Sequence, residues 1–264
     1  MISMKNFLIL SLLVIGITQN IECRPGVDEA THLSSTKAKN INDEAVIFDS
    51  VPAKQINAEA GTSLSVLCEA RGNPKPMISW YRNGQPISEN VVESNKDEKF
   101  RKEAFKVGSR LYLDCVQPED SAEYTCVAKN SKSEAKYSFH VNVEEASEFA
   151  IDEYSHSLCE LRSNGSSPAR ITLWTRIMLR TQNTDAEIYC RSTGNPKPSV
   201  SWYMSYGDED DDLVEIKNSE KYEIKENGDL IIKDLKWLDL KEYYCYVHNL
   251  YGSDSQRTFI YPLK

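Results

Sequence analysis

A ten-residue stretch occurs twice in this chain and constrains its fold more than any other feature. Gly72-Asn-Pro-Lys-Pro-Met-Ile-Ser-Trp-Tyr81 returns as Gly194-Asn-Pro-Lys-Pro-Ser-Val-Ser-Trp-Tyr203, with eight identical residues at an offset of 122 positions. Cys68 and Cys190 precede the two copies at the same offset. A match of this length indicates that one structural unit is present twice.

The residues around the first copy predict β-strands. Leu64, Val66 and Cys68 alternate with Ser65 and Leu67, the period of two that indicates a strand with one buried face. Proline has no N–H to donate to a sheet, so Asn-Pro-Lys-Pro predicts a turn into the next strand. That second strand is expected to carry Trp80 inward.

A Tyr-x-Cys motif follows later in each unit. Tyr124 precedes Cys126, and Tyr243 precedes Cys245, each by two residues and therefore on the same face of a strand. This spacing is typical of a tyrosine corner, in which the phenol hydroxyl donates to the backbone near the start of that strand.

With these motifs in place, both units resemble immunoglobulin domains of the I-set. The resemblance implies an all-β fold of two tandem immunoglobulin-like β-sandwiches, at residues 51–143 and 171–264, joined by a short linker at 144–170. It further implies structural roles for several residues, namely disulfides Cys68–Cys126 and Cys190–Cys245, with Trp80 and Trp202 packed on them and Tyr124 and Tyr243 in the cores. Losing either disulfide is expected to unfold its domain.

Two further cysteines depart from the common pattern. Cys115 aligns with Asp234 of the second unit and is expected in an exposed turn, whereas Cys159 lies in the linker. They form a third disulfide that folds the linker onto the first domain, or they remain two free or intermolecularly paired thiols. Alkylation of the unreduced protein distinguishes the two possibilities.

The N-terminal segment predicts secretion. Lys5 precedes a short apolar run from Phe7 to Ile17, which suits a signal peptide and is too short to span a bilayer. We expect a signal peptide at residues 1–23, with Cys23 at the cleavage boundary, and a disordered arm at 24–50. No membrane anchor is expected, and paired cysteines fit an oxidising extracellular setting.

Charge and motifs argue against several functions. The chain has 31 Lys and Arg against 40 Asp and Glu, a formal net charge of -9, which disfavours binding to nucleic acid. The four histidines are scattered and no catalytic or metal-binding motif occurs, so neither an enzyme nor a cofactor nor a metal site is expected. The acidic run Asp208–Asp212 is read as a solvated loop rather than a weak calcium site. Asn164 begins a sequon and is expected to carry a glycan.

A narrower resemblance suggests what the protein does. The segments Asn227–Trp237 and Thr258–Pro262 look like those of invertebrate secreted two-immunoglobulin proteins, which include the nematode zwei-Ig proteins and an arthropod ecdysone-inducible, insulin-peptide-binding protein. The nematode resemblance implies binding to cell-surface receptors or adhesion proteins that maintains axon and neuron position. The arthropod resemblance implies the alternative, a soluble protein that sequesters insulin-like peptides and antagonises insulin signalling.

Two tryptophans are the candidate partner-binding residues. Trp237 aligns with Pro118 outside the core positions, so its ring is exposed for a partner or packs over the end of its own domain. Trp174 is a second candidate, with the alternative that it covers the junction between the domains. Homophilic pairing is a third and weaker possibility.

Overall fold

The computed structural model describes residues 45–87, 103–146, 152–205 and 213–264. The expected signal peptide, Cys23, most of the N-terminal arm and the acidic run at 208–212 lie outside these residues. The described chain forms two β-sandwiches, as the all-β I-set prediction requires.

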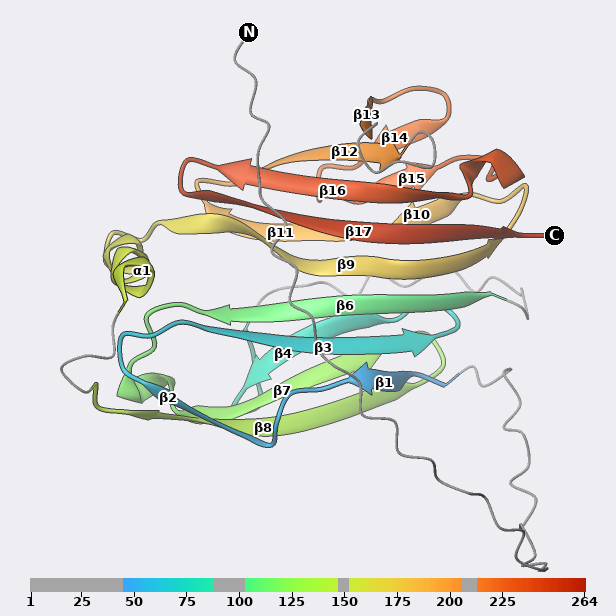
Figure 1. Ribbon diagram of the computed structural model, residues 1–264. Coiled ribbons are helices and arrows are strands. Elements are labelled where there is room, and N and C mark those ends of the chain that lie inside the picture. Colours follow the sequence, from blue (N-terminus) through green and yellow to red (C-terminus); the bar gives the residue numbers. More distant parts are fainter. Residues whose placement is uncertain (1–44, 88–102, 147–151, 206–212) are drawn as a thin grey trace, which may run out of the picture. The chain divides into compact units, whose positions relative to one another are not determined.

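Strands of the first domain form two facing layers (Figure 1). They are β1 (Ile47–Ser50), β2 (Gln55–Glu59), β3 (Leu64–Gly72), β4 (Met77–Arg82), β5 (Gln85–Pro86), β6 (Ala104–Leu113), β7 (Ala122–Lys129) and β8 (Glu134–Glu144), with the 3-10 helix η1 (Pro118–Asp120). One layer is the five-stranded sheet β2-β8-β7-β4-β5, and the other contains β1, β3 and β6. The Cys68–Cys126 disulfide lies between them, fully buried.

The second domain repeats the plan. It contains β9 (Ser167–Thr181), β10 (Ala186–Ile188), β11 (Cys190–Asn195), β12 (Ser199–Ser205), β13 (Leu213–Ile216), β14 (Tyr222–Ile224), β15 (Leu230–Ile232), β16 (Lys241–Asn249) and β17 (Gly252–Leu263), with the 3-10 helix η2 (Trp237–Asp239). One layer holds the three-stranded sheet β10-β15-β14. Trp202 is 0% exposed in the core beside the Cys190–Cys245 disulfide.

One sheet runs through both domains. β6 of the first domain pairs antiparallel with β9 of the second, and β9 pairs in turn with β17 and β11. The result is a nine-stranded sheet in the order β1-β3-β6-β9-β17-β16-β12-β13, with β11 alongside β9. Figure 1 shows β3, β6, β9, β17 and β16 side by side. We call this the shared sheet.

Both tyrosine corners are present. The Tyr124 hydroxyl donates to the Asp120 carbonyl oxygen at 2.9 Å, and the Tyr243 hydroxyl lies 3.3 Å from the Asp239 carbonyl oxygen. Trp80 is also buried, and its indole N–H donates to Ser109 Oγ at 2.8 Å. The residues assigned to the cores from sequence therefore lie in the two cores.

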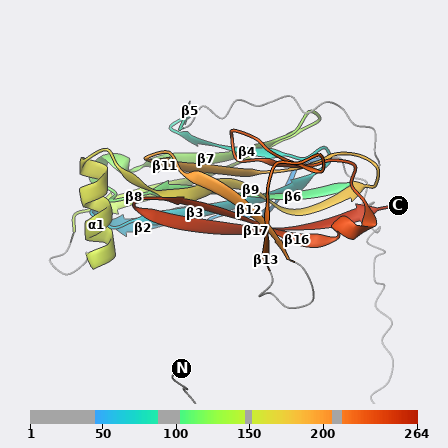
Figure 2. The same cartoon turned by 90° about the horizontal axis from the view of Figure 1, so that it is seen from above.

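The segment expected to be a linker contains a helix, α1 (Glu153–Ser163). The Asp152 side chain accepts from the Ser155 N–H at 2.6 Å and so caps the first turn. Figures 1 and 2 place α1 at the end of the shared sheet where β6 finishes and β9 begins. The arm also ends earlier than expected, because residues 47–50 form β1 and pair with β3.

The expected exposure of Cys115 is wrong. Its side chain is only 7% exposed, and it is bonded to Cys159 of α1, which covers it. Cys115 has a φ of 50°, and Asp234, its counterpart in the second domain, has a φ of 48°. Internal alignment therefore predicts the backbone of this turn correctly, whereas the burial of Cys115 depends on α1, and the side chain of Asp234 is 63% exposed.

Candidate protein-binding surface

An apolar strip lies on the outer face of the shared sheet. Ile177 pairs with Phe259, and Leu179 pairs with Tyr261, on the neighbouring strands β9 and β17. The residues between them, Met178 and Ile260, are 1% and 0% exposed, so this alternation directs the strip away from the core. We define the apolar strip as Ile177, Leu179, Phe259, Tyr261 and Trp237.

Trp237 joins the strip at one end. It begins η2, and its ring lies 5.6 Å from the Tyr261 ring in an edge-on arrangement. The indole is 47% exposed and Phe259 and Tyr261 are each 38% exposed. Both alternatives for Trp237 are thus partly realised, since the ring packs on its own domain and still presents a face to solvent.

Cations border the strip on the side of the first domain. Lys106 of β6 pairs with Ile177, and Arg71 of β3 pairs with Lys106, so a single row crosses from the charges to the strip. The Arg71 and Arg176 side chains are 59% and 46% exposed. The side chains of their carboxylate partners, Asp49 and Glu69, are much less exposed, so the cluster presents mainly its guanidinium groups to solvent although the whole chain is acidic.

The carboxylates of this cluster are shielded from solvent. Asp49 binds Arg71, and Glu69 binds Arg176 and lies 3.1 Å from Lys106 Nζ, with the two acidic side chains only 15% and 6% exposed. A partner would meet the guanidinium groups first. We call Arg71, Lys106 and Arg176 the cationic rim.

Aromatic residues of β16 extend the surface on the other side of the strip. Tyr246 of β16 is 38% exposed and stacks on His248 with ring centroids 5.7 Å apart. Arg257 forms an ion pair with Glu242 at 3.0 Å at this edge. An apolar, aromatic centre with a charged border is the composition of many protein–protein interfaces.

Trp174 does not belong to this surface, and its assignment as a partner-binding residue is wrong. It is 3% exposed, because its indole packs on Gly108 of β6 and on the core of the second domain. The Arg110 guanidinium also lies 5.6 Å from the ring. Trp174 therefore covers the junction between the domains, the alternative that the sequence left open.

Polar contacts hold the two domains in register beneath the strip. Lys75, in the Asn-Pro-Lys-Pro turn of the first domain, donates from Nζ to the Glu187 carbonyl oxygen at 2.6 Å and lies 3.4 Å from the centre of the Tyr189 ring. Burial lowers the pKa of Lys75 to about 8, although the charge of Glu187 opposes this effect. Nearby, Arg180 bonds the buried carboxylate of Glu103 at 3.0 Å.

A cavity of about 480 Å³ opens at the same junction. Lys75, Glu103, Arg180, Glu187 and Lys225 are among the residues that line it. Its charges are paired, since Arg180 binds Glu103, and Lys225 lies 2.6 Å from Glu187. The cavity thus offers no unbalanced charge that would select one class of ligand.

The structure also bears on the predicted glycosylation site, on metal ligands and on membrane spans. Asn164 is exposed at the C-terminal end of α1. Within the described ranges no three His, Cys, Asp or Glu side chains are grouped as metal ligands. The same residues include no helix of a length and apolarity that would cross a membrane.

Strip residues other than Trp237 were missing from the sequence prediction. Their signal is the alternation in Thr258-Phe-Ile-Tyr261, in which every second residue is buried. Because aromatic residues also fill cores, this pattern does not by itself say which face meets solvent. The register of β17 against β9 was needed to decide which of these residues face solvent.

Comparisons with known proteins agree with this architecture of tandem immunoglobulin-like sandwiches. The model of the immunoglobulin I-set domain matches residues 47–143 and 171–260, and the chain belongs to this family. Zwei Ig domain protein zig-4 of Caenorhabditis elegans is 32% identical over 208 residues, which cover 76% of this chain and 74% of that protein. Neural/ectodermal development factor IMP-L2 of Drosophila melanogaster is 26% identical, over 77% of this chain and 71% of its own length.

A solved structure is similar as well. The crystal structure of IMP-L2 superposes with a TM-score of 0.63 at 23% identity, covering 83% of this chain and 95% of that one. This likeness concerns the fold. The sequence relatives support an extracellular binding role.

Proposed function

We propose that this protein is a secreted, non-enzymatic binding protein of the nervous system, which engages a cell-surface or adhesion protein through the apolar strip. The observation that carries the proposal is the solvent exposure of Phe259, Tyr261 and Trp237 on one continuous face. Relatives with neural names, such as neural/ectodermal development factor IMP-L2, support the nervous system as the proposed site of action. Its biological role is to keep axons and neurons in position.

The cationic rim defines the partner further. Arg71 lies two strands from Ile177, or about 10 Å at the usual strand spacing. A partner that presents an apolar ridge with carboxylates at that distance matches both features. Such charge complementarity acts mainly on the association rate and on specificity.

The strip is tested by substitution in the full secreted chain. Phe259→Ser and Trp237→Ala each remove an exposed ring, and each should weaken binding to a panel of neuronal ectodomains by at least tenfold. Leu250→Ser is the matched control, because Leu250 is 83% exposed in the β16–β17 turn away from the strip. Equal binding by all three variants would refute the strip as the interface.

The rim is tested separately. Arg71→Glu should lower the association rate several-fold and flatten its dependence on salt, while leaving the dissociation rate almost unchanged. Lys136→Glu is the control on the opposite sheet of the first domain, where the lysine side chain is 64% exposed. An unchanged association rate for Arg71→Glu would remove the rim from the proposal and leave the strip in place.

Sequestration of insulin-like peptides is the second candidate function. The edge-on Trp237–Tyr261 pair favours it, since an exposed aromatic pair can anchor an apolar hormone surface. Nanomolar capture of an insulin-like peptide that depends on Trp237 would support the trap. Capture of a neuronal ectodomain, with no peptide bound, would support the first function.

A further inference from the structure

We propose that Cys115–Cys159 is an exchangeable disulfide, a modification site for dithiol reductants, whose cleavage in the folded protein loosens the pairing of β6 with β9. The inference is independent of the proposed function. It rests on where this disulfide lies in the chain and on how its surroundings differ from those of the two core disulfides.

The disulfide takes the place of a hairpin turn between two domains. Cys115 follows the end of β6 at Leu113, and Cys159 precedes the start of β9 at Ser167 by about eight residues. Since β6 and β9 are antiparallel neighbours, the sulfur–sulfur bond closes a short covalent connection between paired strands. Without it, the chain from β8 to β9 runs for about 22 residues.

Access distinguishes this disulfide from the others. Cys68, Cys126 and Cys190 are 0% exposed and Cys245 is 1% exposed, so reagents reach them only when a domain opens. Cys159 instead lies half-buried on α1, on the surface of the first domain. Cys159 is therefore the most accessible of the six disulfide cysteines, with its Sγ 3.4 Å from the Gly61 carbonyl oxygen, and we take it as the point of attack by a dithiol.

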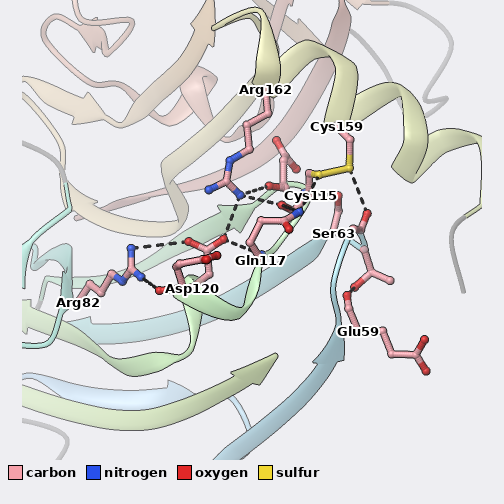
Figure 3. A network of polar contacts seen from close by, with 12 residues as sticks. Glu59, Ser63, Arg82, Cys115, Gln117, Asp120, Cys159 and Arg162 are labelled. Atoms are coloured by element: carbon pink, nitrogen blue, oxygen red, sulfur yellow. Dashed lines mark hydrogen bonds and ion pairs between the residues drawn. A yellow bond between two sulfur atoms is a disulfide. The ribbon is translucent and has the colours of Figure 1, made fainter. Parts of the chain in front are cut away.

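The neighbours of Cys115 suit a leaving thiolate (Figure 3). Gln117 Nε2 lies 3.5 Å from Cys115 Sγ and can donate to it. The Arg162 guanidinium donates to the Cys115 carbonyl oxygen at 2.8 Å and is paired with the Asp120 carboxylate at 3.0 Å, so it fixes the turn that carries Cys115. A hydrogen-bond donor such as Gln117 stabilises a thiolate and speeds its departure.

The exchange is balanced in atoms and electrons. A thiolate of the dithiol attacks Cys159 Sγ, the bond to Cys115 breaks, and the Cys115 thiolate takes up a proton. The second thiol of the reductant then attacks the mixed disulfide, which releases Cys159 as a thiol and leaves the reductant as a cyclic disulfide. Two electrons pass from the dithiol to the protein.

Cleavage changes the tether of the second domain. α1 has 11 residues, of which Ser155 and Leu158 are buried, and a helix of this length is marginal without tertiary support. The effective concentration of β9 at the edge of β6 falls with about the −3/2 power of tether length. Lengthening the tether from about eight to about 22 residues then favours separation of the strands by roughly fivefold.

Differential alkylation tests the first half of the proposal. The oxidised full chain is treated with dithiothreitol under native conditions, quenched with an alkylating reagent and mapped by mass spectrometry. We expect Cys115 and Cys159 to be labelled at least tenfold faster than the core cysteines. Labelling of all six disulfide cysteines at one rate, or of a core pair first, would overturn the proposal of selective cleavage.

Hydrogen exchange tests the second half on the same selectively reduced sample. Amides of β9 between Leu173 and Leu179 should exchange three- to tenfold faster, while those of β7 and β16 keep their protection. Unchanged exchange in β9, or a general loss of protection in the first domain, would contradict loosening. The variant Cys115→Ser/Cys159→Ser should reproduce the effect, and if it fails to fold, the reduced natural chain still decides.

Gln117→Leu distinguishes the effect of the amide donor on the cleavage rate from the effect of solvent access to Cys159. It removes the amide donor to Cys115 Sγ and leaves the exposure of Cys159 in place. We expect cleavage to slow two- to fivefold. An unchanged rate would show that the amide does not assist the leaving thiolate.

Discussion

The indole of Trp174 lies directly on the Cα of Gly108, on the paired strands β9 and β6. A Cβ atom added to Gly108 would stand 2.6 Å from Cζ2 of the ring, closer than any real contact. The two domains can approach to hydrogen-bonding distance here because this residue has no side chain. This contact makes one sheet from the edges of two sandwiches.

Gly108→Val should therefore weaken the junction. Overpacking against the Trp174 indole is expected to cost about 1–3 kcal/mol and to expose the β6–β9 pairing. Denaturant unfolding and hydrogen exchange of β9 measure the two effects. The double variant Gly108→Val/Trp174→Leu should recover part of the loss, and a single variant as stable as the natural chain would contradict the contact.

Ser109 connects the core of the first domain to the backbone of the second. Its Oγ accepts from the Trp80 indole N–H at 2.8 Å and donates to the Thr172 carbonyl oxygen at 2.7 Å. Ser109→Ala removes both bonds from a buried site and should cost about 1–3 kcal/mol in unfolding free energy. Ser138→Ala, at a partly exposed hydroxyl pair with Thr125, is the control and should change stability far less.

Lys75 should make the stability of the folded chain depend on alkaline pH. Burial lowers its pKa from 10.5 to about 8, so the unfolded chain holds the proton more tightly than the folded one between these values. Stability then rises as pH increases from about 8 to 10.5, by on the order of 3 kcal/mol, and stays constant outside that window as far as this group is concerned.

The measurement for Lys75 is a difference between two proteins. Urea unfolding of the natural chain and of Lys75→Met, from pH 7 to pH 10.5, removes the contribution of other groups that titrate there. The natural chain should gain stability relative to the variant as the pH rises. Parallel curves would show that Lys75 keeps an ordinary pKa in the folded protein.

The buried pair Glu103–Arg180 should respond differently to single and double substitution. Their side chains are 2% and 11% exposed. Arg180→Met alone leaves a buried carboxylate without its guanidinium and should cost about 3–5 kcal/mol, whereas Glu103→Met/Arg180→Met should be much closer to the natural chain. A loss in the double variant equal to the sum of the losses in Arg180→Met and Glu103→Met, measured by chemical denaturation, would exclude coupling between the two charges.

The repeated motifs made much of the fold predictable. The spacing between Cys68, Trp80 and Cys126 reflects the strands and turns that bring the three residues between two facing sheets, and local patterns encode it because each strand must turn one face inward. Trp202 and Tyr243 follow from the repeat. These residues act within a single domain, and a single-domain pattern suffices to place them.

The junction between the domains was harder to predict. Trp174 is an apolar residue on a first strand, and only the absence of a side chain at Gly108, 66 residues earlier in the chain, decides that the ring is covered. The helix α1 had a readable signal, with Tyr154, Leu158 and Leu161 spaced for one helical face and Asn164-Gly165 as a stop. Its polar composition masked that signal.

The Cys115–Cys159 disulfide also determines how the chain bears tension. When the two ends of the chain are pulled and the domains unfold, the disulfides carry the force. The shortest covalent path from Cys68 to Cys159 then runs across the first disulfide to Cys126, back along the chain to Cys115, and across the second disulfide. After cleavage of this one bond, the path runs from Cys126 to Cys159 and is roughly 70 Å longer. Thiol exchange would thus set the length to which the molecule can be drawn out between two attachment points.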